Sequence, residues 1–492
     1  MELTKLINSV HAIQVAGEVE RKDISTICCD SRAITKGCVF VAIKGLASDG
    51  HDFVLDAISK GATVVVLDKN CFPEEIFLHR NVTKILVVNS RIALAELSHS
   101  FYKEPSNRLA LIGITGTNGK TTTAWLIQHI LRFANHKTGL MGTIANYIDE
   151  EVIPSKLTTP ESNDLCELLY DMVRKDCSHA VMEVSSHSLA LDRVYGLNYK
   201  TAIFTNLTID HLDFHGTIEN YRDAKKKLFD NLKETSSAIV NIDDSNWNEI
   251  VKDTKAKVYT YGTSEDADFR IENLRCELSG SEFSIRHNEE FYSIQVSLSG
   301  AFNASNITAA FAACLLEGID PMVIIEALKV TRQTPGRFEM YTENEKSVIV
   351  DYAHTPDSLE KTLNNIKEIV KDTRPIITVF GCGGNRDKSK RPMMGKIASE
   401  LSSEVIVTSD NPRNEDAEQI ISEIVKGIEN SNFKIIVNRR EAIAEAVTSS
   451  PANAVILIAG KGHEDYQIIG NEKTHFSDKE EALSHLRENV VI

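Results

Sequence analysis

The chain has 492 residues and a formal net charge of −16, with 42% apolar and 25% charged residues. At about 100–200 residues per domain, this length predicts roughly three domains of ordinary globular composition. The acidic balance argues against a broad basic surface for nucleic acid. No run approaches the roughly 18 apolar residues of a membrane span, and residues 1–5 lack the features of a secretory signal. The nine scattered cysteines form no Cys-x-x-Cys pair, so we expect buried thiols in a cytoplasmic protein.

The first hundred residues predict a small α/β domain. Residues 39–43 and 63–67 are apolar runs typical of buried strands, and helix-like segments alternate with them. Residues 105–107, Pro-Ser-Asn, have the composition of a linker. We therefore expect a first domain over residues 1–107.

A second α/β domain is predicted over residues 108–332. Residues 109–114 form an apolar strand that ends in a glycine-rich turn, and residues 121–133 follow with helical periodicity. Strands alternating with helices predict a mostly parallel sheet. Between residues 257 and 299, apolar and polar residues alternate, which predicts antiparallel strands appended to that sheet. Further strands of the domain are expected at residues 180–184, 202–204 and 238–240.

A third domain is predicted over residues 333–492. The sequence Thr334-Pro335-Gly336 is typical of a hinge. Beyond it, helical segments separate short apolar runs, which predicts a Rossmann-like α/β domain. These runs lie at residues 348–350, 376–380, 405–407 and 454–458.

A phosphate-binding loop is predicted between the strand at 109–114 and the helix that follows. Small residues let backbone N–H groups approach phosphate oxygens, and the helix N-terminus adds positive potential. Lys120 is placed to reach the β- and γ-phosphates of ATP, and the Thr121 hydroxyl to bind Mg²⁺. The usual G-x-x-x-x-G-K-[ST] pattern fails by one position, because its early glycine is Gly113. The predicted ATP-binding residues here are Thr115, Gly116, Thr117, Asn118, Gly119, Lys120, Thr121 and Thr122.

The Gly-Thr-Asn-Gly-Lys-Thr form of this loop resembles that of the Mur ligase family, ATP-dependent amide-forming enzymes of peptidoglycan synthesis, and of the related folylpolyglutamate synthases. The resemblance implies an N-terminal UDP-binding α/β domain, a central ATPase-like parallel sheet with appended antiparallel strands, and a C-terminal Rossmann-like domain. It also implies a monomer. Further similar segments lie at residues 182–189, 206–216, 221–225, 336–339, 351–357 and 381–388.

The resemblance assigns Mg²⁺ binding to Thr121, Glu183, His211 and Lys225. It assigns catalysis to Lys120, Glu183, His211 and Lys225. Glu183 ends a predicted buried strand, where a carboxylate is costly unless it is paired or metal-bound. Mg²⁺ prefers oxygen ligands, so His211 rests on the resemblance, and a structural role is the alternative. The run of lysines at 225–227 would by itself indicate a solvated helix face. The resemblance implies instead that CO₂ converts Lys225 to N6-carboxylysine.

Four more residues are implied to complete the ATP site. Asn303 and Asn306 carry amides that can pair with adenine edges, with helix capping as the alternative. Arg337 and Asp351 are similar to residues that reach the nucleotide when the domains close, the guanidinium on the γ-phosphate and the carboxylate near the ribose. Closure would exclude water from a reactive intermediate.

The implied activity is amide formation through an acyl phosphate. The carboxylate-bearing substrate is UDP-MurNAc-L-Ala-D-Glu, with Arg193 pairing a carboxylate. In the first domain, Ser31 and the turn at residues 45–50 resemble uridine-binding segments, although Leu46 and Ala47 depart from the pattern of many relatives; an ordinary surface turn is the alternative. The residues implied to bind this substrate are Ser31, Thr158, Thr159, Ser185 and Arg193.

The motif Asp410-Asn411-Pro412-Arg413 resembles that of family members that add meso-2,6-diaminopimelate. An arginine can hold the second carboxylate of this amino acid bidentately. Arg386 is expected to assist, and Gly460 and Glu464 to receive the distal ammonium end. A helix N-terminal turn with a surface arginine is the alternative.

Other functions remain open at this point. They are a lysine-adding member of the family, a dipeptide-adding member (MurF), a ligase similar to folylpolyglutamate synthase, and a P-loop switch or non-catalytic nucleotide binder. The expected first domain argues against a folylpolyglutamate synthase, and the diaminopimelate motif against MurF. The set of metal and third-domain residues argues against a switch.

Overall fold

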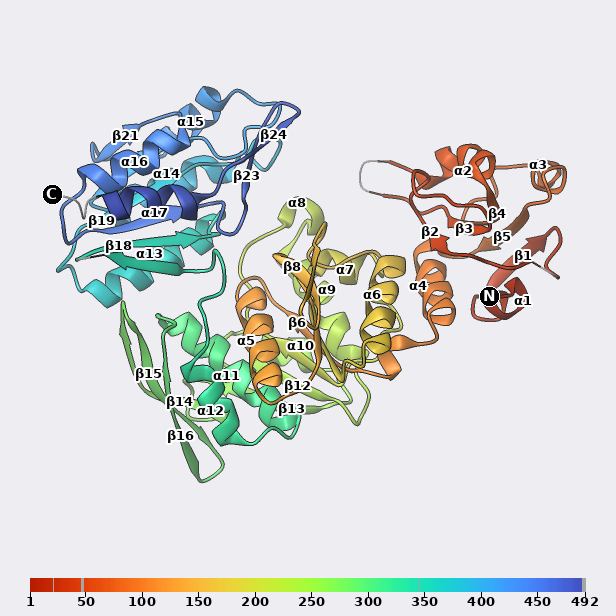
Figure 1. Ribbon diagram of the computed structural model, residues 1–492, viewed down its shortest axis with the longest axis horizontal. Coiled ribbons are helices and arrows are strands. Elements are labelled where there is room, and N and C mark those ends of the chain that lie inside the picture. Colours follow the sequence, from red (N-terminus) through yellow and green to blue (C-terminus); the bar gives the residue numbers. More distant parts are fainter. Residues whose placement is uncertain (21, 46–47, 344, 489–492) are drawn as a thin grey trace.

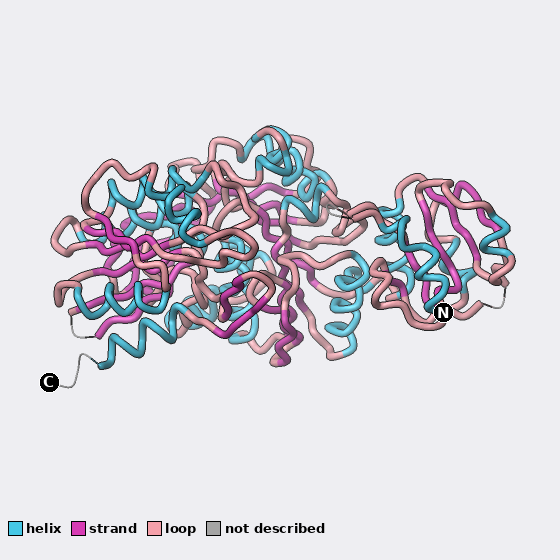
Figure 2. Tube along the Cα trace, turned by 90° about the horizontal axis from the view of Figure 1, so that it is seen from above, coloured by secondary structure: helices cyan, strands magenta, loops and turns pink. Residues whose placement is uncertain are grey.

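The computed structural model describes residues 1–20, 22–45, 48–343 and 345–488. Leu46 and Ala47 therefore lie outside the described residues. Three large sheets follow one another along the chain, each with its own helices (Figure 1). The unit with the N-terminus stands apart at one end of the long axis, and Figure 2 shows it joined to the rest through a narrow neck.

The first sheet has five strands in the order β1-β5-β4-β3-β2 and is parallel except for the antiparallel edge pair β1 and β5. Val64, Val65, Val66 and Leu67 are buried on both faces, which is why this run reads as continuously apolar. The strands are β1 Ala12–Ala16, β2 Ile27–Cys28, β3 Cys38–Val41, β4 Ala62–Leu67 and β5 Thr83–Val87. The helices are α1 Leu3–Ile7, η1 Gly50–Phe53, α2 Val54–Lys60, α3 Glu74–Leu78, α4 Ser90–Phe101 and η2 Pro105–Asn107.

The central sheet has eleven strands in the order β16-β15-β14-β13-β12-β11-β6-β10-β7-β8-β9. The strands are β6 Ala110–Thr115, β7 Thr138–Met141, β8 Ala145–Ile148, β9 Glu151–Pro154, β10 His179–Glu183, β11 Thr201–Phe204, β12 Ser237–Asn241, β13 Lys257–Gly262, β14 Phe269–Glu277, β15 Gly280–His287 and β16 Glu290–Val296. The helices are α5 Lys120–Phe133, α6 Ser162–Arg174, α7 Ser186–Ala190, α8 Leu212–His215, α9 Ile218–Asp230, α10 Trp247–Val251, α11 Ala301–Leu316 and α12 Pro321–Lys329.

The third sheet has six strands in the order β17-β18-β22-β19-β20-β21, with one antiparallel pair, β17 and β18. A separate hairpin, β23 and β24, follows it. The strands are β17 Glu339–Glu343, β18 Lys346–Asp351, β19 Ile376–Phe380, β20 Glu404–Val407, β21 Phe433–Ile435, β22 Val455–Ala459, β23 Tyr466–Ile469 and β24 Glu472–His475. The helices are α13 Pro356–Val370, α14 Lys390–Leu401, α15 Ala417–Val425, α16 Arg439–Ser449 and α17 Asp478–Glu488.

Several expectations need correction. The region 257–299 is antiparallel only in part, because β13 pairs in parallel with β12 and β14 in parallel with β13. The alternation belongs to β14–β16, whose outer face is exposed, whereas β13 ends in a fully buried stretch beneath α11. The antiparallel strands β8 and β9 were not expected. The predicted linker is the short helix η2, and its Pro105 and Ser106 are buried.

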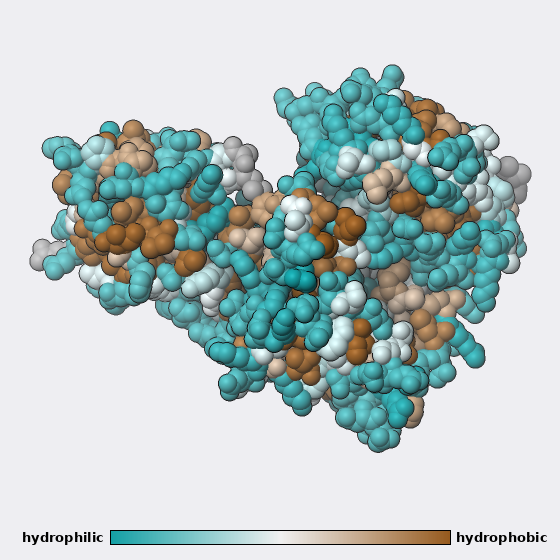
Figure 3. Space-filling model, turned by 180° about the vertical axis from the view of Figure 1, so that it is seen from behind, coloured by the Kyte–Doolittle hydropathy of each residue, from teal (hydrophilic) through white to brown (hydrophobic). Residues whose placement is uncertain are grey.

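The nine cysteines are free, as expected, but Cys71 is exposed and Cys29 and Cys276 are half-buried. Over the described ranges, no helix is both long and apolar enough to cross a membrane. Seen from behind, the first and third domains stand on either side of an open notch above the central domain (Figure 3). The ends of the parallel strands of the central sheet face the third domain, and this edge is where α/β sheets place ligands.

Candidate active site

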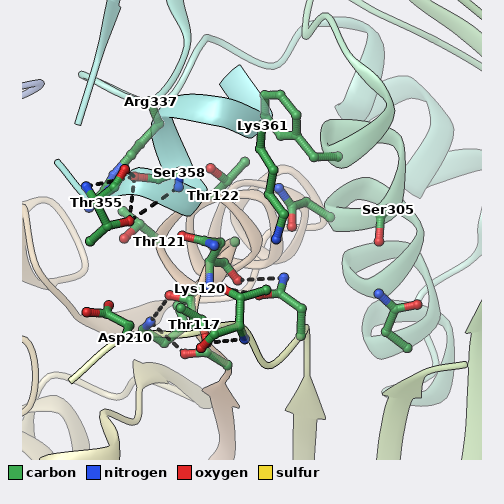
Figure 4. Close-up of a pocket in the computed structure, with 18 of the residues that line it drawn as sticks. Thr117, Lys120, Thr121, Thr122, Asp210, Ser305, Arg337, Thr355, Ser358 and Lys361 are labelled. Atoms are coloured by element: carbon green, nitrogen blue, oxygen red, sulfur yellow. Dashed lines mark hydrogen bonds between the residues drawn. The ribbon is translucent and has the colours of Figure 1, made fainter. Parts of the chain in front are cut away.

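A cavity of about 640 Å³ opens between the central and third domains. Its central-domain wall is made where β6, β10, β11 and β12 end, and its third-domain wall by the segment after β18 and by α13. Figure 4 shows Arg337 and Lys361 of the third domain opposite Lys120 of the central domain. The cavity thus brings together cationic side chains that lie far apart in the sequence.

The phosphate loop lies between β6 and α5, as predicted. Gly116 and Gly119 adopt φ angles of 151° and 88°, which disfavour other residues. An added Cβ would overlap Thr205 Oγ1 at the first position and Asn306 Oδ1 at the second. The Thr205 hydroxyl donates to Asn118 O at 2.6 Å, so the end of β11 fixes the loop from below.

Lys120 turns back onto its own loop. Its Nζ donates to the carbonyl oxygens of Gly116 and Thr117, both at 2.8 Å. Burial lowers the pKa of this ammonium, opposed by the nearby carboxylates of Glu183 and Asp210. An anion entering the cavity can replace the two carbonyl oxygens as acceptor for this ammonium.

Glu183 ends β10 with only 1% of its surface exposed. Its carboxylate accepts hydrogen bonds from the Thr121 hydroxyl at 2.8 Å, the Thr143 N–H at 2.8 Å and the Thr143 hydroxyl at 3.2 Å. Gly142 leaves room for this carboxylate, because an added Cβ would overlap Glu183 Oε1. Carboxylate and hydroxyl oxygens are suitable Mg²⁺ ligands, so Thr121 and Glu183 fit the metal assigned to them.

His211 and Lys225 form a second group in the same cavity. His211 Nε2 lies 3.4 Å from Asp210, and its ring packs against that of His187. Lys225 is 1% exposed, with its Nζ donating to Gly116 O at 2.8 Å and lying 4.3 Å from the centre of the Tyr221 ring. Burial, reinforced by the charge of Lys120, holds the Lys225 pKa well below its usual value. Within the described segments, no three His, Cys, Asp or Glu side chains gather as a ready metal cluster.

Burial of the side chains bears on the structural alternatives for the lysine run and for the histidines near it. Lys225 is buried, whereas a solvated helix face was the alternative for the lysine run. His215 is also buried and lies 3.0 Å from Ser186 Oγ, and burial lowers its pKa to about 4. His187 has its pKa lowered to about 4 mainly by burial, with His211 and His215 contributing.

The two asparagines of α11 have different surroundings. Asn306 lines the cavity beside the phosphate loop. Asn303 is 2% exposed and donates to Ser299 O at 2.8 Å, and its Oδ1 faces Asn306 Nδ2 at 3.4 Å. Asn303 therefore supports the start of α11 and Asn306, and Ser305 joins Asn306 at the cavity wall.

Arg337 and Asp351 reach the cavity from the third domain. The Arg337 guanidinium carbon lies 4.4 Å from the centre of the Tyr352 ring, and its buried Nε has no hydrogen-bond partner in the structure. Asp351 accepts from the N–H groups of Phe338 at 2.7 Å and Ala353 at 3.0 Å, and burial raises its pKa. The arginine is thus prepared for an anion, whereas the aspartate also holds the local backbone.

Asp357 makes a contact between domains that the sequence did not suggest. Its Oδ2 accepts from the Asn118 amide at 3.0 Å and from the Thr208 hydroxyl at 2.8 Å. A residue of α13 is thereby bonded directly to the phosphate loop. The sequence also did not single out Asp210 or Thr143 as site residues. Asp210 directly precedes the predicted His211, which is visible in the sequence. Thr143 faces the predicted Glu183 only in the folded chain.

The residues implied to bind the carboxylate substrate begin at the cavity and extend towards the first domain. Thr158 Oγ1 lies 3.1 Å from Thr143 Oγ1, and Thr159 donates to the carbonyl of Glu183 at 2.8 Å. Ser185 caps α7 by accepting from Ser188 N. Arg193 Nε lies 2.8 Å from Glu161 Oε1. Ser31 is buried in the first domain, away from this cavity.

The diaminopimelate motif lies in a separate cluster, where β19, β20 and β22 end side by side. Glu464 accepts from the Asn411 amide at 2.9 Å, and burial raises the Glu464 pKa. Arg413 adopts a φ of 53° and donates to Gly384 O at 2.8 Å. Arg386 is exposed. Asp410 is buried, Pro412 precedes Arg413 in the turn, and Gly460 has a φ of 118° with Asp410 beside it. The next helix, α15, begins at Ala417, and Arg413 is half-buried, so the motif is not a helix N-terminal turn with a surface arginine.

Three segments of the chain match domain families. Residues 23–102 match "Mur ligase family, catalytic domain", residues 114–314 "Mur ligase middle domain" and residues 336–462 "Mur ligase, glutamate ligase domain". The sequence is also similar to UDP-N-acetylmuramoyl-L-alanyl-D-glutamate--2,6-diaminopimelate ligase of Clostridium botulinum, at 46% identity over 94% of each chain. A second relative, from Clostridium acetobutylicum, has the same name followed by the number 1. It is 44% identical over 99% of this chain and 100% of the relative.

A solved structure of a protein named UDP-N-acetylmuramoyl-L-alanyl-D-glutamate--2,6-diaminopimelate ligase has the same fold. It is 30% identical to this chain, covers 100% of both chains and superposes with a TM-score of 0.71.

Proposed function

Because the chain belongs to the Mur ligase family, we propose that it is the ATP-dependent ligase that adds meso-2,6-diaminopimelate to UDP-MurNAc-L-Ala-D-Glu. The observation that carries this proposal is the full-length identity of 44–46% to relatives named for this reaction. The three sheets support domain limits at residues 1–107, 108–332 and 333–492. We further propose a cytoplasmic location, in keeping with the nine free cysteines, and a monomer, as the family resemblance implies.

ATP binds with its phosphates over the loop from Thr115 to Thr122. Backbone N–H groups of the loop and the start of α5 hold the phosphate oxygens. Lys120 leaves the carbonyls of its own loop for the phosphates, and Arg337, whose Nε has no hydrogen-bond partner in the structure, supplies its guanidinium to the γ-phosphate. Asn306 faces the adenine, positioned by Asn303, and Asp351 lies on the ribose side.

Thr121 and Glu183 would hold one Mg²⁺, and His211 with carboxylated Lys225 a second. The bound metal would neutralise charge on the transferring phosphoryl group. The low pKa of Lys225 supports its modification, since only a neutral amine adds to CO₂. The product is a carbamate, and a proton is released.

The reaction transfers the γ-phosphoryl group of ATP to the substrate carboxylate, which gives an acyl phosphate and ADP. The amine of the amino acid attacks the acyl carbon, and the tetrahedral intermediate loses phosphate to form the amide. Lys120 and Arg337 stabilise the charge that develops on the phosphoryl oxygens. Closure of the third domain excludes water, which would otherwise hydrolyse the acyl phosphate.

The remaining residues of the proposed site determine which substrates bind. Arg193, released from Glu161, pairs with a substrate carboxylate, with Thr158, Thr159 and Ser185 beside it and Ser31 at the uridine end. Arg413 and Arg386 hold the distal carboxylate of diaminopimelate. The distal ammonium group lies among Asp410, Asn411, Gly460 and Glu464, where two carboxylates attract it.

Phosphate release tests the proposal. The purified protein is given Mg·ATP and UDP-MurNAc-L-Ala-D-Glu with meso-diaminopimelate, L-lysine, D-Ala-D-Ala or no amine. We expect release with diaminopimelate only. Equal turnover of L-lysine would reject the amino-acid assignment, and no release with any amine would reject the ligase activity. Arg413→Ala should raise the KM for diaminopimelate far more than that for ATP, whereas the exposed Arg440→Ala should change neither.

A further inference from the structure

Lys461 is a fully buried lysine that the proposed reaction does not use. It follows Gly460 at the end of β22, and its side chain is 0% exposed. Its Nζ donates to Asn411 Oδ1 at 2.9 Å and to the carbonyl of Tyr466 at 2.7 Å. A buried ammonium is costly unless it is paired, so its interactions with these partners must offset the free-energy cost of its desolvation.

Two carboxylates share this ammonium. Lys461 Nζ lies 3.2 Å from Asp410 Oδ1 and 3.7 Å from Glu464 Oε2. Without it, the negative charges of the buried Asp410 and the half-buried Glu464 would repel each other with less compensation. Both residues belong to the proposed diaminopimelate site, and the ammonium beside them is fully buried.

Lys461 also sets the orientation of the Asn411 amide. Asn411 Oδ1 accepts from Lys461 and from Ile468 N at 3.0 Å, so its Nδ2 must face the other way. That Nδ2 donates to Glu464 Oε2 at 2.9 Å. An inverted amide would place nitrogen against the ammonium and oxygen against the carboxylate. One lysine therefore determines the positions of three site residues.

We propose that Lys461 is a positioning residue for the amino-acid substrate, which holds Asp410, Asn411 and Glu464 as a preformed acceptor for the distal ammonium group. The proposal rests on the proposed function for the identity of the amino acid. It assigns Lys461 no contact with ATP or with the UDP-linked substrate. The effect of its loss should consequently appear in the affinity for one substrate out of three.

The test is Lys461→Met, which keeps the length of the side chain and removes the charge. We expect the KM for meso-diaminopimelate to rise about tenfold or more, as for loss of a hydrogen-bonded buried charge. The KM values for ATP and for UDP-MurNAc-L-Ala-D-Glu should stay within about twofold. Lys473→Met is the matched control. Lys473 Nζ lies 3.8 Å from the centre of the Tyr466 ring, which Lys461 Nζ also approaches at 5.7 Å, but Lys473 is exposed on β24.

The outcomes separate the two proposals. An unchanged KM for diaminopimelate in Lys461→Met, or an equal rise of all three KM values, would overturn the role of Lys461. Wild-type protein inactive with every amine would overturn the proposed function. If Lys461→Met does not fold, Lys461→Gln decides, because its neutral amide can still donate hydrogen bonds but carries no charge for the two carboxylates. A selective rise of the diaminopimelate KM in that variant supports the proposal, and no change refutes it.

Discussion

Replacing Gly142 by alanine tests whether the position of the Glu183 carboxylate matters for catalysis. An added Cβ would overlap Glu183 Oε1 and lie 3.3 Å from its Cδ. The oxygen must therefore retreat by about 1 Å to reach an ordinary contact distance. That movement breaks its 2.8 Å hydrogen bond from Thr143 N and changes the 2.8 Å contact with Thr121. The backbone at position 142 lies outside the left-handed region, so alanine adds no backbone strain.

A displacement of about 1 Å at a reacting centre can cost about 100-fold in rate. We expect Gly142→Ala to lower kcat for phosphate release by about this factor, with a raised requirement for Mg²⁺. Ile144→Val, in the same turn but not lining the cavity, is the control. The assay measures initial phosphate release at several Mg²⁺ concentrations, with circular dichroism to confirm folding. A folded Gly142→Ala protein with wild-type kcat would refute the reasoning that this carboxylate must occupy its observed position.

Three further predictions concern the third domain. Asp357→Ala removes the hydrogen-bond acceptor for Asn118 and Thr208 and should raise the KM for ATP about tenfold. Glu360→Ala, at an exposed position of the same helix, should leave this KM unchanged, and an equal rise in both variants would contradict the role of the Asp357 contact. Asp478→Ala leaves Arg439, also 0% exposed, without its carboxylate partner and should cost about 3–5 kcal/mol in urea unfolding. A loss of less than about 1 kcal/mol, the value expected for the exposed pair of Lys396 with Glu400, would count against it. Burial lowers the pKa of His463 to about 4, so the unfolded chain binds more protons between about pH 6.5 and 4 and stability should fall over that interval. His463→Asn should reduce this fall in thermal unfolding, and an unchanged pH dependence would contradict the assignment.

Local chemistry made parts of this molecule predictable. The phosphate loop needs small residues between a buried strand and a helix N-terminus, and that requirement is met within a dozen consecutive positions. The expected strand at 376–380 coincides with β19, and the expected helix at 121–133 differs from α5 by one residue. Such segments are apolar on every buried face, so their pattern does not depend on what packs against them.

Other features depend on partners that are distant in sequence. Thr143 is an ordinary polar residue until the sheet order places β7 beside β10 and its N–H beside Glu183. Asp357 was visible as part of a motif, but its bond to Asn118 joins positions 239 residues apart. In each case tertiary packing decides which polar group a side chain meets.

The cavity also explains how an acidic chain can hold a triphosphate. Lys120, Lys225, Arg337 and Lys361 all line it, although the net charge of the chain is −16. Lys120 and Lys225 both donate to Gly116 O, and burial lowers the pKa of each. A phosphate group that replaced this shared carbonyl would stabilise the charged form of Lys120, whereas the carboxylation proposed for Lys225 needs the neutral amine, which burial favours. In the proposed reaction the two lysines of one site therefore have opposite requirements, because Lys120 must keep its proton and Lys225 must lose it.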